Sequence, residues 1–379
     1  MAAEAIVIDA GSRLLKAGFA IPEQDPQLVM QTAMTKADEG DIDKIDLNGD
    51  DWKENAVNPI ERGAIHDWEA MEDLWRYVFY TGLGWEVGNE GQILIADSLL
   101  TRKASLFLLS FLCFLRSSFF HFIAREKTVQ LMFETFNVNG FYAVEQPVLS
   151  VYAVGRISGC AVDVGHGKID IAPVWEGGIQ HNAVKRFEYA GQDLTELLGT
   201  KLAKSNPHTK LDGFALEQIK EAVAVSLDDS VDYEKKVAEG SVIEHTLPDG
   251  RVISVGSERY TLGEVLYQPS LVEIQEYGIT EQLVRSLSLC SPAECQKPLI
   301  ENIVLCFEAR FQKEVSLHGT PSLRPSVVKP PEYMPERTLQ YSAWIGGAIL
   351  AKVVFPQNQH LTKGDYDEYG PNIVHRKCY

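Results

Sequence analysis

The sequence predicts an α/β fold with two related halves, each a mixed β-sheet core with flanking helices, around a shared cleft. Two strand-turn-strand segments of one pattern, beginning at Ile6 and Cys160, predict the duplication, and amphipathic helical segments occur in both halves. The chain has 379 residues, of which 45% are hydrophobic and 23% charged. This composition is that of a globular protein with core enough for two or three domains, and it excludes a disordered or collagen-like chain.

The first hairpin lies in the segment IVIDAGSRLLKAGFA. Its apolar residues 6–8 predict a buried strand, residues 9–12 a turn, and residues 16–20 a returning strand. The second segment, CAVDVGHGKIDIAPVWEGG from Cys160, repeats this order with a bend at residues 165–167 and a strand through residues 169–174. Two hairpins of one design indicate two related halves.

Residues at the two bends suit a polyphosphate. Glycines let backbone N–H groups approach phosphates closely, hydroxyl and ammonium groups add donors, and two aspartates can hold the waters of a bound Mg²⁺. A single Asp-x-Gly turn is common in ordinary loops, so only a pair of hairpins facing each other predicts a triphosphate site. The residues concerned are Asp9, Gly11, Ser12, Lys16, Asp163, Gly165 and Gly167.

The charge of the chain argues against a direct role on nucleic acid. Its 35 basic and 53 acidic residues give a formal net charge of −18, whereas phosphate-backbone binders gain affinity from Lys and Arg. The first residues carry no secretory signal pattern, and none of the six cysteines forms a Cys-x-x-Cys pair. We therefore expect the cytosol or the nucleus, with no direct nucleic-acid contact.

Local patterns predict three further elements. Asp67 is a suitable N-cap for a helix whose apolar stripe is Met71, Leu74, Trp75, Val78 and Phe79. Residues 248–250 predict a tight turn within a hairpin, and residues 343–354 predict a helix that stops before Pro356.

Several longer motifs resemble the actin family. The strongest are YSAWIGGAILAKVVFPQ from Tyr341 and YDEYGPNIVHRKCY from Tyr366; QPVLSVYAVGRISG, PIERGAIHDWEAMEDLW and LPDGRVISVGSERYTLGEVLYQPS also resemble the family, in its order. The stretches KPPEYMPE and NEGQIL are most similar to nuclear actin-related proteins of plants. The resemblance covers nearly the whole chain and implies an actin-like two-lobed fold, with lobes at residues 1–150 and 151–340 and a segment 341–379 that returns to the first lobe.

The resemblance also implies ATP or ADP with Mg²⁺ in the cleft. Gln146 matches the family's water-orienting glutamine, Asp9 and Asp163 match the metal-side aspartates, and Lys220 with Glu221 matches the adenosine-side pair. Taken without the family, Lys220 and Glu221 form a solvated helix face.

Departures from the family pattern concentrate at this site. Arg13 stands where the family's turn has a glycine, His166 replaces its second acidic residue, and Asp170 replaces its histidine near the attacking water. The family's Gly-Gly-Thr loop is missing after Cys306. We therefore expect no catalysis, with Gln146 and Asp163 vestigial, nucleotide binding weak or absent, and no metal site beyond Mg²⁺-water contacts of Asp9 and Asp163.

Two segments differ from the family pattern. The apolar run Ala104 to Ile123 has the length of a membrane span, but Arg116 and its position inside a lobe argue for an atypical insert and against a membrane. The acidic residues 38–54 replace the family's filament-contact loop and predict a solvated loop. Ordinary polymerisation is therefore not expected.

The resemblance favours an adaptor role. It implies a structural subunit of a SWI/SNF-type chromatin-remodelling complex, nuclear and also cytoplasmic, that docks a helix of the motor subunit in an apolar groove and has another actin-related protein as a further partner. An ATP-hydrolysing cytoskeletal actin and a remote sugar kinase or chaperone ATPase are the alternatives. The groove residues are Tyr152, Ala153, Gly155, Ile157, Ile345, Leu350 and Val353; for Ile345 a core role is equally compatible.

Overall fold

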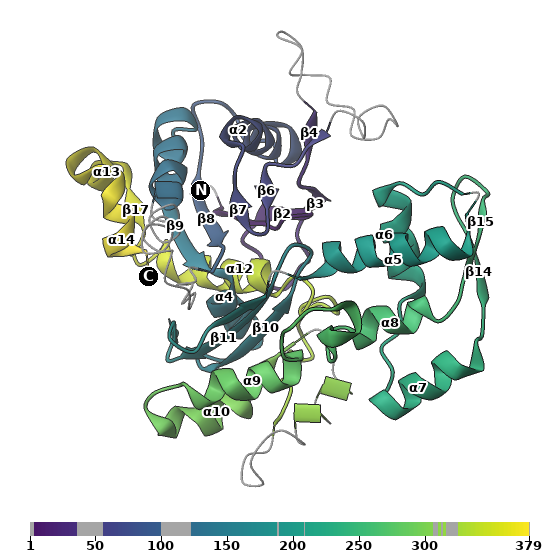
Figure 1. The fold of residues 1–379 in the computed structure, drawn as a ribbon. Coiled ribbons are helices and arrows are strands. Elements are labelled where there is room, and N and C mark those ends of the chain that lie inside the picture. Colours follow the sequence, from purple (N-terminus) through teal and green to yellow (C-terminus); the bar gives the residue numbers. More distant parts are fainter. Residues whose placement is uncertain are drawn as a thin grey trace, which may run out of the picture.

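The computed structural model describes residues 4–35, 56–99, 123–187, 189–207, 209–305, 310–311, 314–315 and 325–378. These residues form two lobes with mixed sheets and flanking helices (Figure 1), so the predicted two-lobed α/β class is confirmed. Residues 38–54, the apolar run up to residue 122 and the junction after Cys306 lie outside the described residues.

The first lobe contains a six-stranded sheet in the order β17-β9-β8-β1-β2-β3. Strand β1 pairs antiparallel with β2 and parallel with β8. The β-branched residues of β1 are fully buried, as expected for a central strand covered on both faces. The bounds are β1 Ile6–Ala10, β2 Leu14–Phe19, β3 Leu28–Gln31, β8 Gln92–Asp97, β9 Gly140–Glu145 and β17 Leu361–Thr362.

The second lobe repeats this arrangement in a five-stranded sheet. Strand β10 pairs antiparallel with β11 and parallel with β16, so each lobe has a hairpin flanked by a parallel strand. The duplication predicted from the two hairpin segments is confirmed. The bounds are β10 Gly159–Val164, β11 Ile169–Trp175, β12 Gly178–Ile179, β13 Lys185–Phe187 and β16 Ile303–Val304.

Helix α2, Trp68–Arg76, covers the first sheet and begins at the predicted cap. The backbone N–H of Ala70 donates to the Asp67 side chain at 3.0 Å. The helix continues as a π-helix, η1 (Tyr77–Gly82), and the whole predicted apolar stripe from Met71 to Phe79 is buried. Residues 123–130 are helical and lead into η2, Leu131–Thr135. Two short pairs complete the lobe: β4 Met34–Thr35 with β5 Ala56–Val57, and β6 Ile60–Glu61 with β7 Ala64–Ile65.

Helices α4, Gln146–Ala153, and α12, Ser342–Val354, pack closely where the lobes join (Figure 1). A Cβ at Gly346 would lie 1.8 Å from the Leu149 carbonyl oxygen, so this contact requires glycine. The helix predicted at residues 343–354 is confirmed. Residue 150, the expected end of the first lobe, lies in α4. The two lobes therefore share a core through these helices.

The outer part of the second lobe has a small core of its own, which α5, α6, α8 and a hairpin enclose. The predicted turn at residues 248–250 joins the hairpin strands, with Gly250 at a φ of 84° that favours glycine. The bounds are α5 Gly191–Ser205, α6 Gly213–Val223, α7 Ser230–Glu239, β14 Ile243–Thr246, β15 Val252–Val255 and α8 Glu258–Glu264.

The remaining elements cover the second sheet and return to the first. Helix α9 packs on β11, and β17 with the last helices packs on the first lobe, where Leu361, Tyr366 and Val374 are buried. The bounds are η3 Pro269–Val272, α9 Ile279–Ser288, η4 Ala293–Cys295, α10 Gln296–Ile300, α13 Lys363–Tyr369, η5 Pro371–Ile373 and α14 Val374–Lys377.

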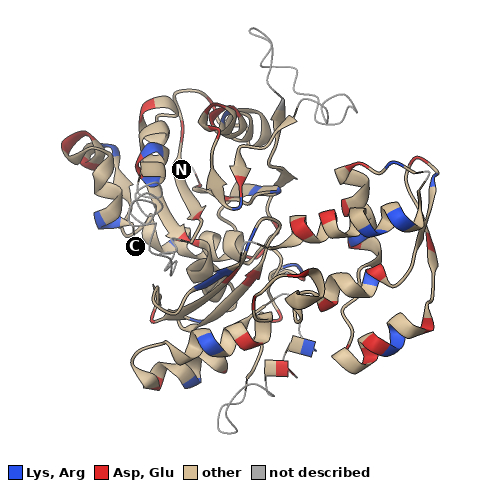
Figure 2. Cartoon of the chain, viewed as in Figure 1, with Lys and Arg blue, Asp and Glu red and all other residues tan. Residues whose placement is uncertain are grey.

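Charged side chains are spread over the outer helices of both lobes (Figure 2), including the acidic residues of α6, α7 and α13. Within the described ranges, no helix has the combination of length and apolar character needed to cross a bilayer.

Candidate functional site

The turns of the two hairpins meet at the cleft between the lobes. Each turn closes in the same way: the N–H of Gly11 donates to the Leu14 carbonyl and that of Gly165 to the Lys168 carbonyl, both at 3.0 Å. A Cβ at Gly167 would lie 2.9 Å from the Ser12 hydroxyl oxygen, so the turns touch where the second has no side chain. Glycine at position 167 therefore permits the close approach of the lobes.

The carboxylate of the first hairpin is already fully engaged. Asp9 is 4% exposed, and its two oxygens accept hydrogen bonds from Lys16 at 2.9 Å and from Gln146 at 2.7 Å. Burial alone would lower the pKa of Lys16, but the ion pair with Asp9 outweighs it and raises that pKa. Asp9 and Lys16 thus neutralise each other within one hairpin.

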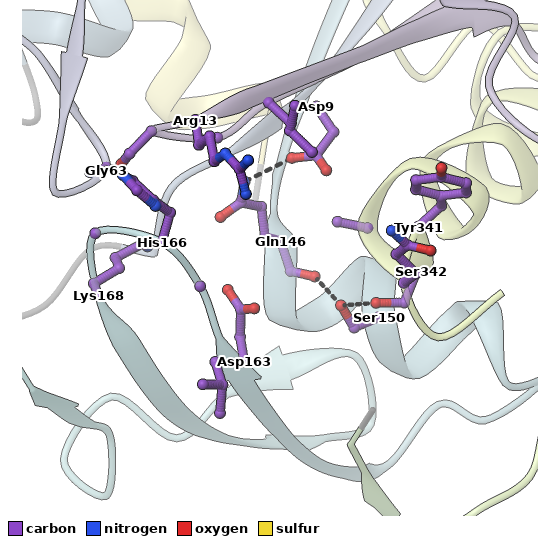
Figure 3. Close-up of a pocket in the computed structure, with 18 of the residues that line it drawn as sticks. Asp9, Arg13, Gly63, Gln146, Ser150, Asp163, His166, Lys168, Tyr341 and Ser342 are labelled. Atoms are coloured by element: carbon purple, nitrogen blue, oxygen red, sulfur yellow. Dashed lines mark hydrogen bonds between the residues drawn. The ribbon is translucent and has the colours of Figure 1, made fainter. Parts of the chain in front are cut away.

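The second hairpin leaves its first carboxylate open. Asp163 is exposed to the cleft solvent, on the wall opposite Asp9 (Figure 3). The protein around it desolvates this carboxyl group and raises its pKa, and Asp170 and Asp9 add to the rise against the opposing effect of Lys168 and Lys16. Asp163 is therefore the acidic group of the hairpins that remains accessible to a ligand.

Asp170, in contrast, is buried among cations. Its carboxylate accepts from Lys168 at 2.7 Å and from Arg186 at 2.6 and 2.8 Å. Burial alone would raise the pKa of Asp170, but these two cations outweigh it and lower that pKa. The resemblance implies that the family has a histidine near the attacking water at position 170. In this chain the carboxylate at that position forms ion pairs instead.

Arg13 extends from the first turn to helix α6 of the other lobe. Its Nε lies 2.7 Å from Glu217 Oε2, and its Nη1 donates to Glu221. Glu217 also lies 3.1 Å from His166 Nδ1 of the second turn. Burial alone would raise the pKa of Glu217, but the neighbouring His166, Arg13 and Lys220 outweigh it, so this pKa is lowered.

Lys220 lines the cleft, but its ammonium is bonded to the chain itself. Its ammonium donates to the Gly191 carbonyl and to the Thr195 hydroxyl, both at 2.7 Å. Its pKa is lowered, first by burial and also by Arg13. The adenosine-side pair expected from the resemblance, Lys220 and Glu221, is therefore engaged by the chain itself.

The cleft retains a cavity of about 610 Å³ between both turns, Gln146 and Tyr341 (Figure 3). This volume falls in the ordinary range of small-molecule sites. The glycine turns of the phosphate half fit the ATP or ADP that the resemblance implies, because their backbones approach the cavity closely. On the nucleoside side, Lys220 lines the cavity but donates to Gly191 and Thr195, and Glu221 accepts from Arg13, so both groups are already bonded to the protein.

The expected groove residues divide into a set that reaches the surface, wholly or in part, and a buried set. Those at the surface come from the end of α4, the turn after it and the C-terminal half of α12, which pack on each other. We call them the docking patch: Tyr152, Gly155, Ile157, Leu350 and Val353. Ile157 and Val353 are the most exposed of its large apolar side chains, at 66% and 43%.

Two expected groove residues belong to the core instead. Ile345 is fully buried and Ala153 is 1% exposed, so neither is available to a partner. At about 100° per residue, Ile345 lies about 140° around α12 from Leu350 and faces the shared core. The sequence pattern alone did not separate these two faces, because α12 is apolar on most of its circumference.

Other residues at the cleft were missed by sequence reasoning. Arg62 pairs with Asp193 at 2.9 Å across the lobes, and Lys168 donates to the Ser98 hydroxyl at 2.8 Å. Glu217 carried a usable signal, because it lies one helical turn before Glu221 and so on the same face of α6. The other contacts join residues far apart in the chain and had no local signal.

No group of three or more His, Cys, Asp or Glu side chains in the described ranges is arranged to hold a metal ion. Cys160, Cys290, Cys295 and Cys378 are buried free thiols, and burial raises the pKa of each.

Comparison with known proteins gives full-length matches. A family model described as Actin matches residues 1–213 and 212–379. Actin-related protein 7 of Arabidopsis thaliana is 54% identical over 99% of this chain and 100% of its own length, and actin-related protein 7 of Oryza sativa subsp. indica is 50% identical over the same shares. Actin-like protein 7A of Mus musculus is 31% identical over 99% of this chain and 83% of its own length.

Proposed function

The chain belongs to the actin family, and we propose that it is a non-filamentous adaptor subunit of a SWI/SNF-type chromatin-remodelling complex and not an ATPase. It docks a long helix of the motor subunit beside another actin-related protein. It acts in the nucleus and is also present in the cytoplasm.

The docking patch is the observation that carries this proposal. Ile157 and Val353 expose large apolar side chains, while Tyr152 and Leu350 pack partly on the shared core. Apolar side chains that pack on the core on one side and are open to solvent on the other suit the apolar stripe of a helix. Gly155, at a φ of 70°, turns the chain after α4 without adding a side chain to the surface.

The net charge indicates what else the partner helix carries. At −18, the chain attracts cationic partners and repels nucleic acid. We therefore expect an amphipathic helix whose apolar stripe contacts the docking patch and whose edges are rich in Lys and Arg. Any contact of the chain with chromatin is then indirect.

The cleft supports a role without catalysis. The actin fold commonly binds a nucleotide with Mg²⁺, but here both oxygens of Asp9 accept from the protein and Asp170 is held by Lys168 and Arg186. A general base must reach the proton that it removes, and Asp170 is directed to its ion pairs instead.

An ATP-hydrolysing actin-like protein is the second candidate. The 610 Å³ cavity favours it, since Gln146 and the open carboxylate of Asp163 both line that space. This alternative predicts steady phosphate release from Mg-ATP by the purified chain, whereas the adaptor proposal predicts none above the background.

The test measures binding of a synthetic peptide of the motor-subunit helix by isothermal titration calorimetry. We expect Ile157→Asp and Leu350→Asp each to weaken binding at least about tenfold, roughly 1.4 kcal/mol, because a carboxylate would be buried against the apolar stripe. Circular dichroism confirms that each variant is folded.

Val252→Asp is the matched control. Like Ile157, Val252 exposes a β-branched apolar side chain, at 54%, but it lies on the β14–β15 hairpin in the outer part of the second lobe. Its substitution should leave peptide affinity unchanged. If folded Ile157→Asp and Leu350→Asp both bind like the wild type, the docking patch is not the binding site.

A further inference from the structure

The strongest unassigned feature is the contact that Arg13 makes across the cleft. Its guanidinium starts in the phosphate-side turn of the first lobe and reaches Glu217 and Glu221 on α6 of the second. These partners are separated from Arg13 by more than 200 positions, 208 for Glu221. We call this contact the Arg13 bridge.

The Arg13 bridge has the geometry of a specific contact. Glu217 and Glu221 are four residues apart and project from one face of α6, so the planar guanidinium meets both with different nitrogens. The side chains of Arg13 and Glu217 are 23% and 12% exposed, so this arm of the Arg13 bridge is largely shielded from water, whereas Glu221 in the other arm is 57% exposed. A forked contact with one shielded arm restrains two lobes more than a single surface pair does.

Other polar contacts accompany the Arg13 bridge across the cleft. Arg62 pairs with Asp193 at 2.9 Å and also donates to the Gly167 carbonyl, and Lys168 donates to Ser98. In a ligand-dependent clamp, the bound molecule makes the link between the lobes. In this chain protein side chains make it, and Arg13 does so from the turn that faces the phosphate half.

The same contact uses the group that a nucleoside would need. Glu221, assigned to the adenosine side by the resemblance, is engaged by Arg13, and Glu217 is held between Arg13 and His166. A glycine at position 13 would remove the side chain that lines the cavity and would release both carboxylates from their pair with Arg13.

We propose that Arg13 is the specificity-determining residue of the cleft. It replaces a bound nucleoside phosphate as the link between the lobes, so the lobes keep the closed arrangement described here without a nucleotide. This inference extends the proposed non-enzymatic role to the cleft and rests on that role. The docking patch is separate from the Arg13 bridge, so the two can be tested apart.

The test compares wild type and Arg13→Gly in the full chain, by titration with mant-ATP and Mg²⁺ and by thermal unfolding. We expect Arg13→Gly to melt below the wild type without ligand, to bind mant-ATP at least tenfold more tightly, and to gain Tm on addition of Mg-ATP. The wild-type Tm should not respond to Mg-ATP.

Arg251→Gly is the matched control, because Arg251 is also an arginine at a hairpin turn that pairs with a carboxylate, Asp249, but within its own lobe. It should bind mant-ATP like the wild type. Arg13→Ser repeats the test if circular dichroism shows Arg13→Gly to be unfolded.

Two results would overturn the proposal: a folded Arg13 variant whose mant-ATP affinity equals that of the wild type, or a wild type whose Tm already rises with Mg-ATP. Binding of the motor-helix peptide is measured on the same samples. If either result is found together with wild-type peptide binding, the proposed role of the Arg13 bridge is wrong and the adaptor proposal is unaffected.

Discussion

The two hairpins at the cleft share one backbone geometry but differ in the charges that face each other across their strands. In β1–β2 the register places Asp9 opposite Lys16, whereas in β10–β11 it places Asp163 opposite Asp170. The first hairpin therefore neutralises its carboxylate across the strand pair. The second brings two carboxylates together at the equivalent position, where like charges repel.

The second hairpin resolves that repulsion with cations from outside the pair. Lys168 and Arg186 bind Asp170 in the interior, which leaves Asp163 open to the cleft. The duplicated fold thus preserves the turn geometry, while neighbouring side chains decide which carboxylate is structural and which is accessible.

The largest effect is expected from Asp170→Ala. Its carboxylate is 2% exposed, and its loss leaves Lys168 and Arg186 without the counter-ion that they share. We expect a loss of about 3–5 kcal/mol in the free energy of unfolding, measured by urea titration, because breaking a buried ion pair leaves an uncompensated charge. Asp163→Ala is the control on the same strand pair and should change stability by about 0.5 kcal/mol or less. Equal effects of the two substitutions would mean that the carboxylates have the same role.

The smaller prediction concerns pH. The pKa of Asp163 is raised in the folded chain above its ordinary value near 3.8, so its ionised form is less favourable folded than unfolded. Its protonated form therefore favours folding below about pH 3.8, and this benefit is lost as the pH rises through the folded pKa.

Asp163→Asn tests this sign. At pH 7 it should raise Tm slightly, because it removes the penalised charge, and the gain should vanish below pH 3.8, where the wild-type carboxyl is protonated in both states. Melting curves between pH 3 and pH 7 measure the difference. A gain that grows toward acid pH would show that the pKa is lowered instead.

Much of the fold was predictable because its signals are local. The strands around Asp9 and Asp163, the cap at Asp67 and the helix after Tyr341 each follow from residues close in the chain. The returning strand of the first hairpin begins at Leu14, two residues before its predicted start.

The contacts that define the site were not predictable in the same way. Sequence reasoning marked Arg13 as a departure from the family pattern, but not its partners on α6. Likewise it marked Asp170 as a replaced histidine, without the ion pairs that bury it. Such pairs join segments that meet only after both lobes have folded, so no local pattern specifies them.

The most direct measurement of the central claim is a calorimetric titration of the nucleotide-free chain with the motor-helix peptide, repeated in saturating Mg-ATP. An adaptor held closed by its own side chains binds the peptide with the same affinity in both titrations. Peptide binding that appears only with Mg-ATP would contradict the account, because the docking patch would then depend on a nucleotide-driven change of the cleft.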